Sequence, residues 1–92
     1  MSYAVVCDVP ASWDHYSVVA AALEGEVPEG LVVHAAGPTD EGFRMIDVWE
    51  SEAAWLRFRA DRLASLSEGL LHPPIARALE LAHVVVVGDR AP

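Results

Sequence analysis

The sequence predicts one α+β domain spanning residues 1–92, with its strands and helices in the order β-α-β-β-α-β. Two patterns predict this class. Four short segments are rich in residues that favour strands, and two longer segments repeat their apolar residues at helical spacing. No linker, repeat or low-complexity tract separates these segments, so we expect a single small domain with a modest core.

The first strand and the first helix follow each other closely. Residues 3–9 are β-prone, and Pro10 ends the strand. Ser12 is a candidate N-cap for a helix that we expect to run to about Glu24. The apolar positions of this helix, spaced to share one face, are Trp13, Tyr16, Val19, Ala20 and Leu23.

A hairpin and a second helix come next. Residues 31–36 and 43–49 predict the second and third strands, and the turn-forming residues 37–42 between them predict a hairpin. Ser51 is the candidate N-cap of the second helix. The apolar stripe of that helix is Trp55, Phe58, Leu63 and Leu66.

The C-terminal part of the chain is harder to assign. Residues 67–71 are ambiguous, and two prolines after His72 break the chain. We expect residues 75–79 to form a short helical turn that starts on these prolines. Residues 81–87 predict the last strand, and the remaining residues form a polar tail.

This order of elements is the split βαβ arrangement of ferredoxin-like folds, a four-stranded antiparallel sheet with both helices on one face. The predicted strands are apolar on both faces: the first points Val5 and Cys7 one way, and Ala4 and Val6 the other. The helices can cover one face only, which leaves roughly 400 Å² of apolar sheet bare. We therefore expect a homodimer in which two copies pack sheet to sheet.

Composition and charge limit the classes of partner that the protein is expected to bind. The formal net charge is −8, with 14 acidic and 6 basic residues, which disfavours nucleic acid and anionic membrane surfaces. The strongly apolar run at residues 84–87 is too short to span a bilayer. The single Cys7 and the absence of a basic leader before the first strand predict a cytoplasmic protein.

One stretch of the sequence resembles a known family. The phrase GFRMIDVWES, residues 42–51, leads into EAAWLRF, residues 52–58. It resembles the dimeric α/β-barrel superfamily, and within it the antibiotic-biosynthesis-monooxygenase-like (ABM) branch. There a third strand ending in V-W-E-S/D runs into a helix that opens with E-x-A/F. Residues 34–44 are similar to small actinobacterial members with no assigned function. The resemblance implies two ferredoxin-like units joined as a dimeric α/β barrel.

The resemblance also implies a small-molecule pocket between sheet and helices in each protomer. Members include cofactor-free oxygenases, haem-degrading enzymes, isomerases, aldoxime dehydratases and proteins with no known activity. Trp49 matches the tryptophan at the strand end of the family. Two departures count against haem degradation: the chain has no Asn, and residues 51–66 contain no His. We expect no cofactor.

Asp47 is the most informative candidate for chemistry. By the two-residue period of a strand it shares a face with Phe43, Met45 and Trp49. An ionised carboxylate on such a face is costly unless it is paired. Asp47 is then either a general acid or base in an apolar pocket, or the partner of an Arg such as Arg44 or Arg77, or of a group across the dimer.

Two histidines are the other catalytic candidates. His34 lies on the predicted second strand and His83 on the predicted last strand, each among apolar neighbours. Such an imidazole either exchanges protons near neutral pH or is a core residue bonded to the backbone. The second and fourth strands lie at opposite edges of this fold, so the two need not meet. No pair of histidines has the spacing of a zinc motif, and we expect no metal.

Several aromatic residues are candidates for contact with a substrate, and equally for simple core packing. His72, in a loop that could close over a pocket mouth, is a further candidate. The aromatic candidates are Trp13, Tyr16, Trp49, Trp55 and Phe58.

Three hypotheses follow. The first is a cofactor-independent enzyme, of isomerase, cyclase or oxygenase type, that acts on a small hydrophobic or aromatic carbonyl compound through Asp47, His34 and His83. The second is a binding module that holds such a ligand without chemistry. The third is a structural dimeric domain with a filled core. A cavity between helices and sheet would separate the first two from the third.

Overall fold

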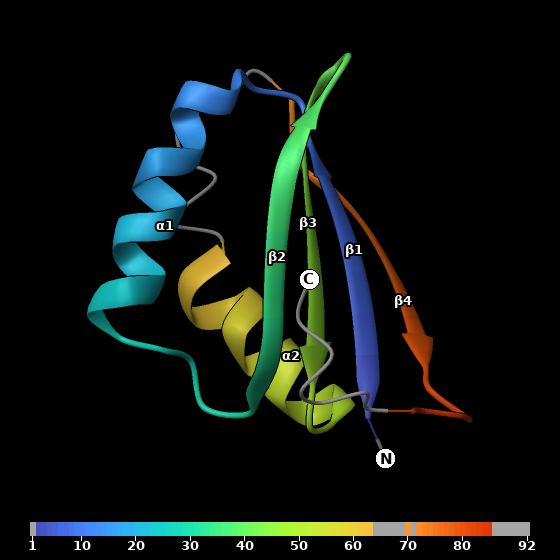
Figure 1. Cartoon of the computed structure of the whole chain (residues 1–92). Coiled ribbons are helices and arrows are strands. Elements are labelled where there is room, and N and C mark those ends of the chain that lie inside the picture. The colour runs from blue at the N-terminus through green and yellow to red at the C-terminus, as the bar shows by residue number, and fades with distance from the viewer. Residues whose placement is uncertain (1, 64–69, 71, 86–92) are drawn as a thin grey trace.

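The computed structural model describes residues 2–63, 70 and 72–85. Its strands form one antiparallel sheet in the order β2-β3-β1-β4, and both helices lie on the same face of it, as Figure 1 shows. The strands are β1 (Tyr3–Val9), β2 (Leu31–Thr39), β3 (Gly42–Trp49) and β4 (Ile75–Glu80). The helices are α1 (Tyr16–Gly25) and α2 (Glu52–Phe58). This is the predicted ferredoxin-like α+β arrangement.

The first strand and the hairpin are confirmed. β1 has its predicted bounds and occupies the interior of the sheet, pairing with β3 on one side and β4 on the other. β2 runs three residues beyond the predicted strand, to Thr39, because only Asp40 and Glu41 are needed to turn the chain. Pro38 is tolerated in this strand because β2 lies at the edge of the sheet.

The helices differ from prediction at their ends. A 3₁₀ turn, Trp13–His15, precedes α1, and the Ser12 side chain makes no capping hydrogen bond. Ser51 does cap α2: its Oγ accepts from the Ala54 N–H at 3.2 Å. α2 continues into a π-helical turn, Arg59–Leu63. Within the part of the chain that the structure describes, no helix is long and apolar enough to cross a membrane.

The prediction for the last strand is wrong. Residues 75–79, expected as a helical turn, belong to β4, and the described part of the expected strand, residues 81–85, lies outside helices and strands. Alanine-rich IARALE has a helical composition, but pairing with β1 overrides it, placing Ala76 opposite Cys7 and Ala78 opposite Val5. The predicted Leu66 and most of the ambiguous stretch 67–71 lie outside the described residues.

The core lies between the helices and the sheet. Alternate residues of β1 and β3 point to that side and are buried, as their period predicts. One cluster of buried residues packs under α2, and the other lies under α1. The first consists of Val5, Trp49, Ala54, Trp55 and Phe58, and the second of Cys7, Val9, Val19, Phe43 and Met45.

The opposite face of the sheet has no helix on it. Large apolar side chains there are exposed in this single chain: Ile46 is 47% exposed and Leu79 is 65% exposed. Val33 and Ile75 are exposed on the same face, according to the strand register. We call these four residues the outer face. The prediction of a sheet with one bare apolar side is confirmed, although β4 contributes residues other than those expected.

Candidate functional site

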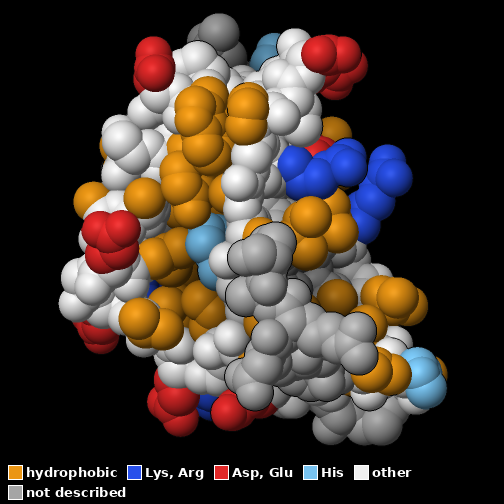
Figure 2. Space-filling model, viewed as in Figure 1, with side chains coloured by type: hydrophobic (Ala, Val, Ile, Leu, Met, Phe, Trp, Pro, Cys, Tyr) orange, Lys and Arg blue, Asp and Glu red, His pale blue; other side chains and the backbone are white. Residues whose placement is uncertain are grey.

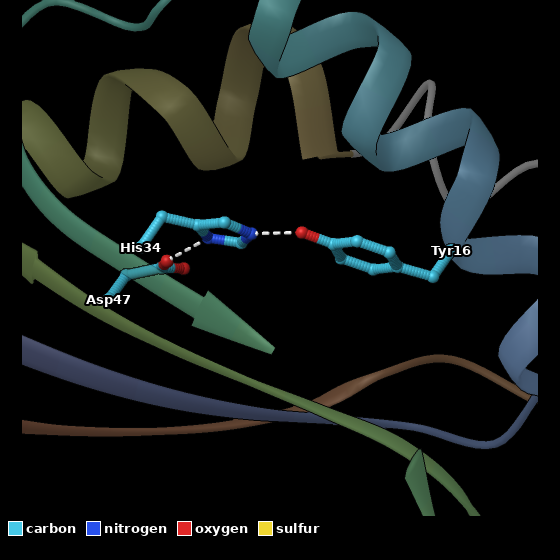
Figure 3. Close-up of polar contacts among 3 residues, drawn as sticks. All are labelled: Tyr16, His34 and Asp47. Carbon is cyan, nitrogen blue, oxygen red and sulfur yellow. Dashed lines mark hydrogen bonds and ion pairs between the residues drawn. The ribbon is translucent and has the colours of Figure 1, made fainter. Parts of the chain in front are cut away.

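The hairpin places His34 and Asp47 directly opposite each other. The two residues are register partners in β2 and β3, and both side chains point toward the helices. The Nδ1 atom of His34 contacts Oδ1 of Asp47 (Figure 3). Asp47 is only 4% exposed, and no other charged or polar residue that the structure describes is classed as buried. The imidazole thus supplies the partner that a buried carboxylate requires.

Tyr16 completes a chain of three groups. It is the first residue of α1, and its hydroxyl oxygen lies 2.6 Å from Nε2 of His34. The two rings are nearly parallel, with centroids 5.9 Å apart and 5° between their planes. Figure 3 shows the phenol and the carboxylate at opposite ends of the imidazole. We call Tyr16, His34 and Asp47 the relay.

The donors and acceptors of the relay fix where the protons lie when the imidazole is neutral. An ionised carboxylate only accepts hydrogen bonds, so the proton between His34 and Asp47 is on Nδ1. Nε2 then carries a lone pair, and the hydroxyl of Tyr16 donates to it. Oδ1 of Asp47, both ring nitrogens of His34 and the hydroxyl of Tyr16 therefore each have a partner, which reduces the cost of burying Asp47.

Tyr16 holds its proton at rest. Burial raises the pKa of its phenol above the ordinary value, and the negative charges of Asp47 and then Glu24 raise it further. The phenol is therefore neutral near pH 7 and releases its proton only if the neighbouring imidazole takes it.

The relay opens toward the seam between α1 and β2. Tyr16 and His34 are both half-buried, whereas Asp47 lies beneath them. Figure 2 shows hydrophobic side chains gathered along this seam, with a histidine side chain among them. Trp13 stacks on Tyr16 with ring centroids 4.7 Å apart, and Phe43 meets Tyr16 edge-on at 5.6 Å. The phenol ring is thus held by contacts with two further aromatic rings.

The alternative prediction that Asp47 pairs with an arginine is wrong. Arg44 is three residues from Asp47 on the same strand, so it points to the other face of the sheet. There its Nε and Nη2 bond to the carboxylate of Asp8 at 2.7 and 3.1 Å. Arg77 belongs to the same outer side, because it is the register partner of Val6.

The two remaining histidine candidates lie away from the relay. His83 follows β4 instead of lying on a strand, and His72 precedes the prolines before β4. Both are exposed. Among the described residues, the side-chain hydrogen bonds of His34 join it to Tyr16 and Asp47, and those of Asp47 join it to His34. The structure therefore brings together two of the three catalytic candidates.

Three aromatic candidates for substrate contact pack against one another in the core. Trp49 lies 6.1 Å from Trp55 and 5.1 Å from Phe58, measured between ring centroids. The Nε1 donor of Trp49 is buried and has no partner among the described residues. The helix–sheet cavity lined by Val19, Met45 and neighbouring side chains holds only about 10 Å³. Larger hollows, of about 440 and 390 Å³, open at the hairpin end of the sheet.

Cys7 is a structural residue, as its position on β1 predicts. It is fully buried beneath α1, and burial raises the pKa of its thiol to about 11, with Asp47 and Asp8 adding to the rise. The described residues contain no group of three or more histidine, cysteine, aspartate or glutamate side chains that could share a metal ion.

Sequence reasoning missed the polar role of Tyr16. Its helical spacing predicts a core or substrate-contacting ring and gives no role to the hydroxyl. The sequence carries no direct signal for it, because the pairing of residues 34 and 47 follows from the register of the hairpin that the structure shows. A buried carboxylate bonded to one imidazole nitrogen leaves the other nitrogen in need of a partner, and Tyr16 is the hydroxylated residue on the face of α1 above them.

The fold occurs in solved structures of low sequence identity. Rv0793 from Mycobacterium tuberculosis superposes with a TM-score of 0.65 at 16% identity, over 94% of this chain and 100% of its own. A candidate antibiotic biosynthesis monooxygenase from Deinococcus radiodurans gives 0.66 at 14% identity, over 95% and 98%. A monooxygenase from the gene ActVA-Orf6 of Streptomyces coelicolor, in complex with the ligand nanaomycin D, gives 0.56 at 22%, over 92% and 90%.

These likenesses establish the fold. The chain has the ferredoxin-like fold of ABM-like proteins, as the resemblance at residues 42–58 implies. Neither protein-family models nor curated protein sequences match the chain.

Proposed function

We propose that the protein binds a small hydrophobic or aromatic carbonyl compound at the seam between α1 and β2. It transfers a proton to or from that compound through the relay, without a cofactor. The observation that carries this proposal is the continuous chain of contacts from a buried carboxylate, through an imidazole, to a half-buried phenol. A chain of this kind lets a weakly acidic side chain act as a base when its own proton can leave.

The proton moves in one concerted step. The oxygen of Tyr16 takes a proton from a carbon next to the carbonyl of the ligand, or from a ligand hydroxyl, while its own proton passes to Nε2 of His34. The imidazolium that forms is stabilised by the carboxylate of Asp47. The reverse step returns a proton to the ligand at a different atom, as isomerisation or cyclisation requires. His83 has no part in this relay because it lies exposed beyond β4.

Two further observations support a ligand of this class. The seam is lined by hydrophobic side chains, and the stacked rings of Trp13 and Tyr16 offer a flat surface. The structurally similar Streptomyces coelicolor monooxygenase binds the ligand nanaomycin D. An oxygenase-type reaction is included in the proposal, since removing a proton from an electron-rich ligand is a step it can share with isomerisation.

We also propose that the protein is a homodimer joined through the outer face. Ile46 and Leu79 are large, apolar and exposed there, and no element of the described chain lies over them. A second copy, packed about a two-fold axis, would bury the same residues on both partners. This arrangement would leave the helix-covered side, and with it the relay, facing solvent in each protomer.

A second candidate function is ligand binding without chemistry, or a purely structural domain. The mutual packing of Trp49, Trp55 and Phe58 favours the structural domain, because these rings fill the space beneath α2 and the helix–sheet cavity beneath α1 holds only about 10 Å³. In that case the relay serves only to neutralise the cost of burying Asp47.

Deuterium exchange of a simple aromatic ketone separates these functions. In D₂O, the wild-type protein is expected to accelerate loss of the α-proton signals of 2-tetralone, followed by proton NMR. Asp47→Asn should lower this rate by roughly 10²–10⁴-fold, the range of general-base contributions, because it leaves the imidazolium without a charged partner. Tyr3→Phe is the control, since the hydroxyl of Tyr3 donates to Glu52 and not to a member of the relay.

Each outcome of this experiment favours a different function. Equal exchange by wild type and Asp47→Asn removes the relay from any catalytic role. Binding of 2-tetralone, seen as shifted tyrosine and histidine resonances, without acceleration of exchange favours the binding module. Absence of both effects for 2-tetralone, together with absence of binding of 1,4-naphthoquinone, favours the structural domain.

A further inference from the structure

The environment of Tyr16 joins a proton acceptor to an aromatic path that reaches the surface. On one side its hydroxyl bonds to Nε2 of His34 at 2.6 Å. On the other its ring lies parallel to the indole of Trp13, with 4.7 Å between centroids and 5° between planes. Trp13 is 41% exposed. These are the two components that one-electron oxidation of a phenol requires, a base for the proton and a route for the electron.

We propose that Tyr16 is a redox-active tyrosine, which gives one electron through Trp13 to an outer-sphere one-electron oxidant and its phenolic proton to His34. The O–H bond of Tyr16 breaks, and a new N–H bond forms at Nε2. The electron reduces the oxidant. The products are a neutral tyrosyl radical, an imidazolium at His34 and the reduced oxidant. This activity goes beyond proton transfer to a carbonyl compound and does not depend on it.

The hydrogen bond to His34 makes the oxidation feasible. A phenol that loses an electron becomes a strong acid, so the step is favourable only when a base receives the proton at the same time. Nε2 is in place to do so, and the positive charge that it acquires faces the carboxylate of Asp47. Because the phenol is neutral at rest, electron and proton must leave together, and replacing H by D should slow the step.

Trp13 is the tryptophan placed to conduct the electron. The other two, Trp49 and Trp55, are 1% and 3% exposed and belong to the cluster beneath α2. Trp13 alone among the three contacts the ring of Tyr16 in the described structure. An oxidant too large to enter the protein can therefore reach Tyr16 through the exposed indole.

The chain contains its own control for this proposal. It has two tyrosines, and the other, Tyr3, donates to a carboxylate oxygen of Glu52 at 3.2 Å. That bond is longer, and a carboxylate is a weaker base than an imidazole. Tyr3 should therefore contribute little radical under conditions that oxidise Tyr16.

The experiment oxidises the protein with flash-generated tris(bipyridine)ruthenium(III) and records the radical by electron paramagnetic resonance after rapid freezing. Wild type and Tyr3→Phe should give the same neutral tyrosyl signal, and Tyr16→Phe should lose it. His34→Gln should slow its formation by at least about tenfold, the rate equivalent of one charge-assisted hydrogen bond, and should remove the effect of D₂O. Trp13→Phe should slow formation without abolishing the D₂O effect.

A measurement on the wild-type protein keeps the proposal testable if a variant fails to fold. With ¹⁵N-labelled histidine, electron–nuclear double resonance should detect coupling of the tyrosyl radical to an exchangeable proton and to an imidazole nitrogen. A radical that lacks both couplings, or a signal of undiminished size in folded Tyr16→Phe, overturns the proposal. This test uses no carbonyl compound and the deuterium-exchange test uses no oxidant, so the two activities are measured separately.

Discussion

Asp47 shows how one buried group organises its surroundings. Its charge is balanced by a neutral donor, the Nδ1–H of His34, and not by an arginine. A neutral donor leaves the negative charge of Asp47 in place, and after burial this charge is the next cause that raises the pKa of Tyr16. An arginine at the same place would have neutralised Asp47 and removed that effect on the phenol.

Cys7 offers a test of how burial raises a pKa, at a side chain that lies outside the relay. Its folded pKa of about 11 lies above the ordinary value of 9.0, so the folded state keeps a proton that the unfolded state loses between these pH values. Stability due to this thiol is therefore present below pH 9 and lost as pH rises toward 11. The loss should be on the order of 3 kcal/mol, the equivalent of a shift of about two units in pKa.

The measurement is urea unfolding of wild type and Cys7→Ala from pH 8 to pH 11.5. The advantage of wild type over the variant should shrink across this range, while the tyrosines, present in both proteins, cancel. A constant difference between the two proteins would mean that the thiol is not shielded from water.

Individual site residues were predictable to different degrees. Asp47 could be singled out because it is the one acidic residue on a strand face that otherwise carries Phe43, Met45 and Trp49. A charged side chain there violates the pattern of a buried strand face. Its partner could not be deduced with the same ease, since pairing of residues 34 and 47 depends on the length of the hairpin turn. The contact with Tyr16 depends on how α1 crosses the sheet, which no local pattern specifies.

At the scale of elements, the secondary structure was predictable where local preference and tertiary pairing agree. β1, the hairpin and α2 combine strand or helix patterns with matching turn or cap residues. β4 is the exception, because its alanines favour a helix and only pairing with β1 makes it a strand. Valine-rich residues 84–87 looked more strand-like than the segment that completes the sheet.

The two serines that precede helices give a matched test of capping. Ser51→Ala should cost about 1 kcal/mol of stability, because it removes the acceptor for the Ala54 N–H. Ser12→Ala should change stability by less than about 0.5 kcal/mol, since Ser12 makes no such bond. Urea unfolding of both variants measures the difference. Equal losses would show that the cap at Ser51 contributes nothing specific.

At the scale of the whole molecule, the two faces of the sheet carry different kinds of side chains. The helix-covered face carries the core and the relay, and the outer face carries exposed apolar side chains around the Asp8–Arg44 ion pair. An exposed apolar sheet face of this kind is typical of an interaction surface, which is why we propose a dimer. The apolar character of both faces of β1 and β3 was evident from the sequence, because a period of two needs no knowledge of the fold.

Sedimentation velocity tests the proposed dimer. The wild-type protein should sediment as a dimer at micromolar concentration. Ile46→Arg should weaken association by at least on the order of hundredfold, because it places like charges in an apolar interface. The control is Val18→Arg, which replaces an equally exposed apolar residue on α1, 52% exposed against 47% for Ile46. A monomeric wild type, or equal effects of the two variants, would contradict assembly through the outer face.

The relay forms only when the chain is folded, because α1, β2 and β3 each supply one of its members. Nitrogen-15 NMR of the His34 imidazole at pH 8, assigned with His34→Gln, tests it most directly. A relay places the proton on Nδ1 and leaves Nε2 as an acceptor whose resonance moves in Tyr16→Phe. An imidazole protonated on Nε2 with a free Nδ1, or an Nε2 resonance that does not respond to loss of the Tyr16 hydroxyl, would contradict it.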